Sequence, residues 1–177
     1  MAFRMDKLTV KAQEAVQNAQ QLAEQRGNPQ LMPLHLLRAL LDESGGIVRP
    51  LLDKCGANIN TLRAQLREAL DRLPKVEGTG GEVHLSNDLA RLLNLTDKVA
   101  QKRGDQYITS ELFILAALED KGPLARILKD AGVQKAAIER AIDEIRGGSK
   151  VDDPNVEEQR GALEKFTIDL TERAEQG

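Results

Sequence analysis

An internal repeat constrains the fold of this chain more than any other feature of its sequence. Six residues of the first copy, Leu8, Ala23, Arg26, Gly27, Ala39 and Leu41, recur 77 positions later as Leu85, Ala100, Arg103, Gly104, Ala116 and Leu118. After one deletion the spacing becomes 76, which matches Leu52 with Leu128 and Gly56 with Gly132. Self-similarity at a fixed spacing is the mark of a repeat architecture. The spacing therefore predicts a duplicated structural unit.

Each copy is expected to fold into four amphipathic helices. In the first copy, residues 8–74, the helices are expected at 9–26, 35–43, 47–55 and between Asn58 and Pro74. In the second copy, residues 85–146, they are expected at 87–103, 111–120, 123–131 and 134–146. The evidence is apolar residues at helical spacing, N-cap residues such as Thr9 and Ser86, and glycines at the expected C-terminal ends. No window alternates as a strand does, so the chain is predicted to be all-α.

The composition changes at Gly147, after the last expected helix of the repeats. Residues 147–160 are rich in Gly, Pro and acidic side chains and have too few apolar residues to bury a core. We therefore expect a repeat domain over residues 1–146 followed by a flexible linker. Residues 161–177 predict a C-terminal helix without a partner helix, the first element of a domain that is cut off.

The composition excludes several classes of function. A net charge of −3 and 2% aromatic residues without Trp provide neither a basic surface nor a stacking platform for nucleic acid. No apolar run is long enough to span a membrane, and the N-terminus lacks the apolar core of a signal peptide. The single cysteine, Cys55, allows no internal disulfide, which fits a reducing cytoplasm. We expect a cytoplasmic protein that binds neither nucleic acid nor membranes.

The residues that could carry chemistry do not form a recognisable active site. GTGGE at 78–82 lacks the Gly-Lys-Ser/Thr ending of a phosphate-binding loop and is typical of a linker. His35, His84 and Cys55 lack the spacing of zinc ligands, and capping or packing explains His35. No Ser-His-Asp arrangement is evident. The sequence therefore assigns no catalytic residue, metal site or cofactor to this chain.

The second helices of the two copies differ in how many apolar residues they contain. The first copy reads HLLRALL, and the second reads LFILAAL, with Leu112 in place of His35 and leucine in place of Arg38. A surface helix needs only one apolar stripe. The additional apolar residues are therefore either buried at the centre of the domain or exposed as a patch. A patch with Asp105 and Glu111 at its rim would bind apolar segments of another chain.

Four segments of the chain resemble a known family. They are PLHLLRALL, LPKVEGTGGEV, DKVAQKRGDQYITSELFILAALE and KFTIDLTERAEQG. Together they resemble the Clp amino-terminal domain, in particular that of the ClpB family of bacterial protein disaggregases. The last segment is similar to the start of the first AAA+ ATPase module of that family. The resemblance covers essentially all 177 residues and implies an eight-helix domain, a linker and the beginning of an ATPase module.

The resemblance implies a chaperone function. ClpB-like proteins are homohexamers that use ATP and Mg to thread aggregated polypeptides through a central pore, together with the DnaK system. Their amino-terminal domain captures exposed apolar segments of unfolded or aggregated proteins. The present chain is expected to be a monomer without a cofactor or Walker motifs of its own. Two alternatives share the fold: a domain that docks a folded adaptor, and a module that regulates the ATPase ring without binding clients.

The resemblance also implies a binding groove. Its apolar floor falls on Leu95, Val99 and Leu112, and its polar edge falls on Thr9, Asp105 and Glu111. Val99 stands where the family often has leucine, so that wall is expected to be shallower. If Leu112 lines the groove, the substitution Leu112→Asp should abolish client binding without loss of helicity. If Leu112 lies in the core, the same substitution should unfold the domain.

Overall fold

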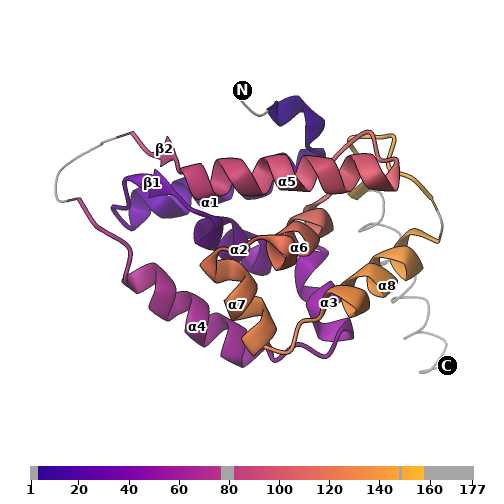
Figure 1. Ribbon diagram of the computed structural model, residues 1–177. Helices are drawn as coiled ribbons and strands as arrows, with labels where there is room; N and C mark the ends of the chain where they lie inside the picture. Colours follow the sequence, from indigo (N-terminus) through magenta and orange to yellow (C-terminus); the bar gives the residue numbers. More distant parts are fainter. Residues whose placement is uncertain (1–3, 77–81, 148, 158–177) are drawn as a thin grey trace, which may run out of the picture.

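The computed structural model describes residues 4–76, 82–147 and 149–157, and this part of the chain is almost entirely helical (Figure 1). The first repeat contains a one-turn 3-10 helix, η1 (Met5–Lys7), and helices α1 (Val10–Gln25), α2 (Pro33–Asp42), α3 (Val48–Lys54) and α4 (Ile59–Asp71). The second repeat contains α5 (Asn87–Arg103), α6 (Ser110–Glu119), α7 (Pro123–Asp130) and α8 (Lys135–Arg146). The predicted all-α fold with a duplicated four-helix unit is confirmed. The helix predicted over 161–177 lies outside the described residues.

The predicted N-caps are found at equivalent positions of the two repeats. The Oγ1 atom of Thr9 accepts a hydrogen bond from the Ala12 amide at 3.2 Å. The Oγ atom of Ser86 accepts one from the Leu89 amide at 3.0 Å. Each bond satisfies a backbone donor that the first turn of the helix cannot pair internally. These side chains therefore fix where the first helix of each repeat begins.

Short parallel strand pairs join the two repeats, which the sequence pattern did not predict. Strand β1 (Gln30–Leu31) pairs with β2 (His84–Leu85), so the chain that leads from the first repeat into the second is part of the fold at this point. A single bridge joins Leu8 to Ile108. Leu8 and Leu85 are 77 residues apart, and so are Leu31 and Ile108. Each repeat thus pairs its lead-in segment with the other repeat's loop before the second helix. Pairings of one or two residues are too short to give strand alternation in a sequence.

The second helices of the repeats form the centre of the domain. In Figure 1, α6 lies between α5 on one side and α3, α7 and α8 on the other, and it contacts all four helices. Every residue from Ser110 to Leu118 is buried. Leu112 has no exposed surface. The apolar excess of this helix is therefore packed in the core, the first of the two alternatives that the sequence left open.

Candidate functional site

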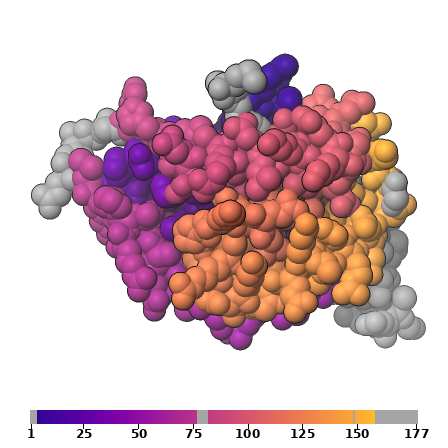
Figure 2. All heavy atoms as spheres, viewed as in Figure 1, coloured from indigo at the N-terminus to yellow at the C-terminus, as the bar shows by residue number. Residues whose placement is uncertain are grey.

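An open pocket lies between α5 and the C-terminal end of α6. Its volume is about 800 Å³, and it is lined by Arg91, Asn94, Leu95, Lys98, Glu119, Asp120 and Lys121. Leu95, one of the lining residues, is half-buried and packs against the hydrophobic core. Arg91 pairs with Asp120 at 3.0 Å across the rim. Figure 2 shows the face of the molecule on which α5 lies above α7 and α8. The pocket thus combines one apolar contact with charges of both signs.

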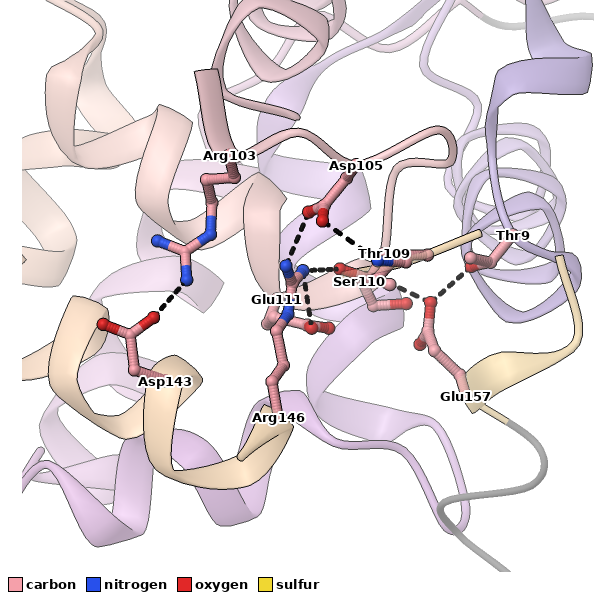
Figure 3. A network of polar contacts seen from close by, with 10 residues as sticks. Thr9, Arg103, Asp105, Thr109, Ser110, Glu111, Asp143, Arg146 and Glu157 are labelled. Carbon is pink, nitrogen blue, oxygen red and sulfur yellow. Dashed lines mark hydrogen bonds and ion pairs between the residues drawn. The ribbon is translucent and has the colours of Figure 1, made fainter. Parts of the chain in front are cut away.

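A buried polar network lies at the N-terminal end of α6 (Figure 3). The Arg146 guanidinium donates to Asp105 Oδ2 at 2.6 Å, to Thr109 Oγ1 at 3.0 Å and to Glu111 Oε1 at 3.3 Å. The side chains of the three charged residues are at most 3% exposed. Buried charges are tolerated when they are paired and hydrogen-bonded. Arg146 therefore makes it possible for both carboxylates to lie away from water.

Glu157 extends this network to the start of α1. Its Oε1 atom accepts a hydrogen bond from the Thr9 hydroxyl and another from the Ser110 amide at 2.9 Å (Figure 3). The Ser110 amide belongs to the first turn of α6, whose donors lack partners within the helix. Burial raises the pKa of Glu157 to about 7, and the nearby Glu111 adds to the rise. The hydrogen bonds from Thr9 and Ser110 oppose this rise because they favour the charged carboxylate.

The structure brings together three of the six residues that the resemblance assigned to the groove. Thr9, Asp105 and Glu111 belong to one buried network instead of an exposed rim. Of the apolar three, Leu95 lines the open pocket. Val99 is 7% exposed and Leu112 is fully buried, so a polypeptide could not reach Leu112 without movement of the residues that cover it. The role of these residues in binding stays a prediction.

Two members of the network were missed by sequence reasoning. Arg146 follows Ile138 and Ile142 at spacings of four, so the apolar face of α8 continues directly onto it. That spacing was a signal for its burial. Glu157 lies in the segment expected to be a flexible linker, and no local pattern connects it to Thr9, 148 residues earlier. Residues 147–160 were expected to be a flexible linker, but within them Val151, Pro154 and Glu157 form hydrogen bonds with the domain.

His35 serves as a helix cap in the first repeat. The Met32 amide donates to His35 Nδ1 at 2.9 Å, and Nε2–H donates to Asn28 Oδ1 at 2.9 Å. Burial lowers the pKa of His35 to about 4, with a further contribution from the charge of Arg26, so the ring is neutral at pH 7. Capping thus accounts for this residue.

The described part of the chain has no cluster of three or more side chains suited to hold a metal ion. Within the same residues, no helix combines the length and apolar character needed to cross a bilayer.

Comparisons with known proteins agree with this fold. A family model described as the Clp repeat (R) N-terminal domain matches residues 7–131. The chain is 56% identical over 175 residues to the chaperone protein ClpB of Vibrio cholerae, covering 99% of this chain and 20% of that protein. The Hsp104 N-terminal domain from Candida albicans has a TM-score of 0.73 and 26% identity, covering 85% of this chain and 98% of that one.

A further solved structure has the same fold. It is described as a complex of the ClpV N-domain with a VipB peptide, and it has a TM-score of 0.65 and 21% identity over 81% of this chain and 89% of that one. The present chain spans about a fifth of the length of the curated relatives it matches. The resemblance seen in the sequence is confirmed by the family model and by a relative that matches almost every residue. The chain belongs to the Clp N-terminal domain family and corresponds to the N-terminal part of ClpB chaperones.

Proposed function

We propose that this domain captures exposed apolar segments of unfolded or aggregated polypeptides for a ClpB-type disaggregase. The observation that carries the proposal is the open pocket at Leu95. It offers an apolar contact to a side chain of the client, and Arg91 and Lys98 offer charged partners to the polar groups around it. Native proteins bury their apolar segments, so such a pocket favours non-native chains. The peptide complex of the ClpV N-domain supports the choice, because it contains this fold together with a peptide.

Binding at a single pocket of this kind is expected to be weak. Apolar burial contributes about 25 cal/mol per Å². The client must also be ordered, which removes part of this gain. Several weak sites on one ring bind more tightly because tethering raises the effective concentration. We therefore propose that the parent protein is a cytoplasmic homohexamer that displays several such domains above its pore.

The remaining activities belong to parts of the parent protein beyond this chain. We propose that its ATPase modules bind ATP and Mg, drive threading through the pore and cooperate with the DnaK system. The domain described here then has a binding role and contributes no catalytic residue. Its contribution to disaggregation is the first capture of the client.

An NMR titration of this chain with a permanently unfolded protein tests the proposal. Chemical-shift changes are expected at Leu95 and at its pocket neighbours Arg91, Lys98 and Lys121. The variant Leu95→Gln should weaken binding about tenfold, because it removes roughly 1.5 kcal/mol or more of apolar contact. The matched control is Val76→Gln, which changes an apolar residue that is 59% exposed and lies outside the pocket.

Two results would contradict the proposal. Equal loss of binding in Leu95→Gln and Val76→Gln would mean that clients contact apolar surface in general. A flat titration, with the client still processed by the full-length ATPase, would favour a regulatory module or an adaptor dock instead.

A further inference from the structure

Residues 150–157, which we call the docked segment, lie along the edge formed by Thr9, Asp105 and Ser110. The Val151 amide donates to Asp105 Oδ1 at 3.1 Å, and the Val151 carbonyl accepts from the Gln106 amide at 2.7 Å. The Val151 side chain has no exposed surface. The segment is therefore held at its beginning by both backbone and side-chain contacts.

The far end of the docked segment satisfies the first turns of two helices. The Pro154 carbonyl accepts a hydrogen bond from the Val10 amide of α1 at 2.9 Å. The Glu157 carboxyl group accepts from the Ser110 amide of α6 and from the Thr9 hydroxyl (Figure 3). Helix N-termini hold unpaired amides and a partial positive charge. The site therefore binds this segment through one carbonyl oxygen and one carboxylate.

The first repeat contains the counterpart of this docking. There the chain after α4 lies on the loop after α1: Asn28 Nδ2 donates to the Pro74 carbonyl at 3.0 Å, and the Val76 amide donates to the Gly27 carbonyl at 2.9 Å. Asn28 is the position that matches Asp105, 77 residues later. The loop after the first helix thus binds the chain after the fourth helix in both repeats. Docking is therefore a feature of the repeated unit.

We infer that residues 150–157 are a built-in competitor for polypeptides at the Thr9–Ser110 edge, so that a client reaches this edge only when the segment is released. The inference rests on the proposed client-binding function and adds a regulation to it. The released edge would accept chains that place a carboxylate side chain at the start of α6. Three of the residues that the family resemblance assigned to client binding lie in the network that the segment completes.

Protonation of Glu157 is expected to strengthen docking. The charged group near the Glu157 carboxyl is Glu111 of α6, which in turn pairs with Arg146 of α8, and Arg146 also pairs with Asp105. Because the pKa is about 7 when docked and near its ordinary value of 4.5 when released, the docked form binds more protons between these values. Docking therefore tightens as the pH falls from about 7 towards 4.5, and it is weakest above 7.

Three variants of the full 177-residue chain test the inference. Glu157→Ala removes the acceptor for Thr9 and Ser110, Glu157→Gln keeps an acceptor oxygen without the charge, and Asp152→Ala changes an exposed acid of the same segment. Amide hydrogen exchange at Val10, Gln106 and Ser110 reports release, and titration with an unfolded protein reports competition. Circular dichroism checks that the helices remain.

In Glu157→Ala we expect exchange at these amides and client affinity both to rise about tenfold, the effect of losing one to two hydrogen bonds. Asp152→Ala should match the parent chain at pH 7.5. Glu157→Gln, which is neutral at every pH, should dock at pH 7.5 more firmly than the parent chain and about as firmly as the parent chain near pH 5, and it should lose the pH dependence of docking. Faster exchange in Glu157→Ala with unchanged client affinity would overturn the competition, and unchanged exchange would overturn the docking. Absence of client binding in every variant, Glu157→Ala included, would instead overturn the proposed function together with the competition.

Discussion

The two repeats stabilise the start of their second helices with different chemistry. In the first repeat, Asn28 and His35 form a neutral pair within one loop and helix. In the second repeat, Asp105 occupies the position of Asn28, and its partner is Arg146 at the end of α8. The neutral pair is complete within a few residues of chain. The charged network needs Arg146 from the distant helix α8. Through the proximity of Glu111 and Glu157 it also involves the docked segment after α8.

The surfaces of the two repeats differ in a related way. Asn18, Gln21 and Asp42 line a pocket between α1 and α2 that matches the pocket between α5 and α6. The counterparts of Asn18 and Gln21, 77 residues later, are Leu95 and Lys98. The first pocket therefore has two uncharged amides where the second has an apolar side chain and a basic one, although Leu22 and Ala39 also line the first pocket. The two repeats thus share their helical arrangement but differ in the side chains that line this pocket.

The largest expected effect concerns the core helix of the second repeat. Leu112→Asp places a carboxylate where the side chain has no exposed surface, and it should destabilise the domain by more than about 4 kcal/mol. The control Leu95→Asp introduces the same charge at the open pocket and should leave the domain folded. Urea unfolding followed by circular dichroism measures both. If the Leu112→Asp chain stays folded and loses only client binding, the conclusion that Leu112 is a core residue is wrong and Leu112 belongs to the binding groove.

A smaller effect is expected when the charged network loses its cation. Arg146→Ala removes the cation that the buried carboxylates of Asp105 and Glu111 share and should cost about 3 to 5 kcal/mol. The control Arg103→Ala removes an ion pair to Asp143, whose side chain is 66% exposed, and should cost less than about 1 kcal/mol. Urea midpoints of the two variants give the comparison. Equal losses would mean that the buried network contributes no more than a surface pair.

The smallest expected effect concerns the neutral pair of the first repeat. The folded pKa of His35, about 4, lies below its ordinary value of 6.5, so the unfolded chain binds more protons as the pH falls. Stability from this residue is complete above pH 6.5 and should fall by about 1 kcal/mol between pH 6.5 and 5.5. The variant His35→Leu, which copies the second repeat, should lack this contribution. The measurement is the difference between the free energies of unfolding of the parent chain and of His35→Leu at each pH. A difference that stays constant with pH would contradict the lowered pKa of His35.

Local features of the sequence were sufficient to predict the helices. Caps such as Thr9 and Ser86, and the 77-residue spacing, depend on neighbours or on self-comparison, and both are visible in one sequence. The pattern of α6 also favoured burial of Leu112, because a helix that is apolar on every side is typical of a core. Only the family resemblance placed Leu112 in an accessible groove. The contact between Glu157 and Thr9 could not be predicted from the sequence, since it depends on how the docked segment packs on the folded domain.

The reciprocal strand pairing between the repeats has a consequence for how this domain could have arisen. Leu8 pairs with Ile108, and Leu31 pairs with Leu85, so each half lends its lead-in segment to the other. A single half would offer the same two edges to a second copy of itself, in the manner of an isologous two-fold dimer. Fusion of two such halves makes the association intramolecular, so assembly no longer depends on protein concentration.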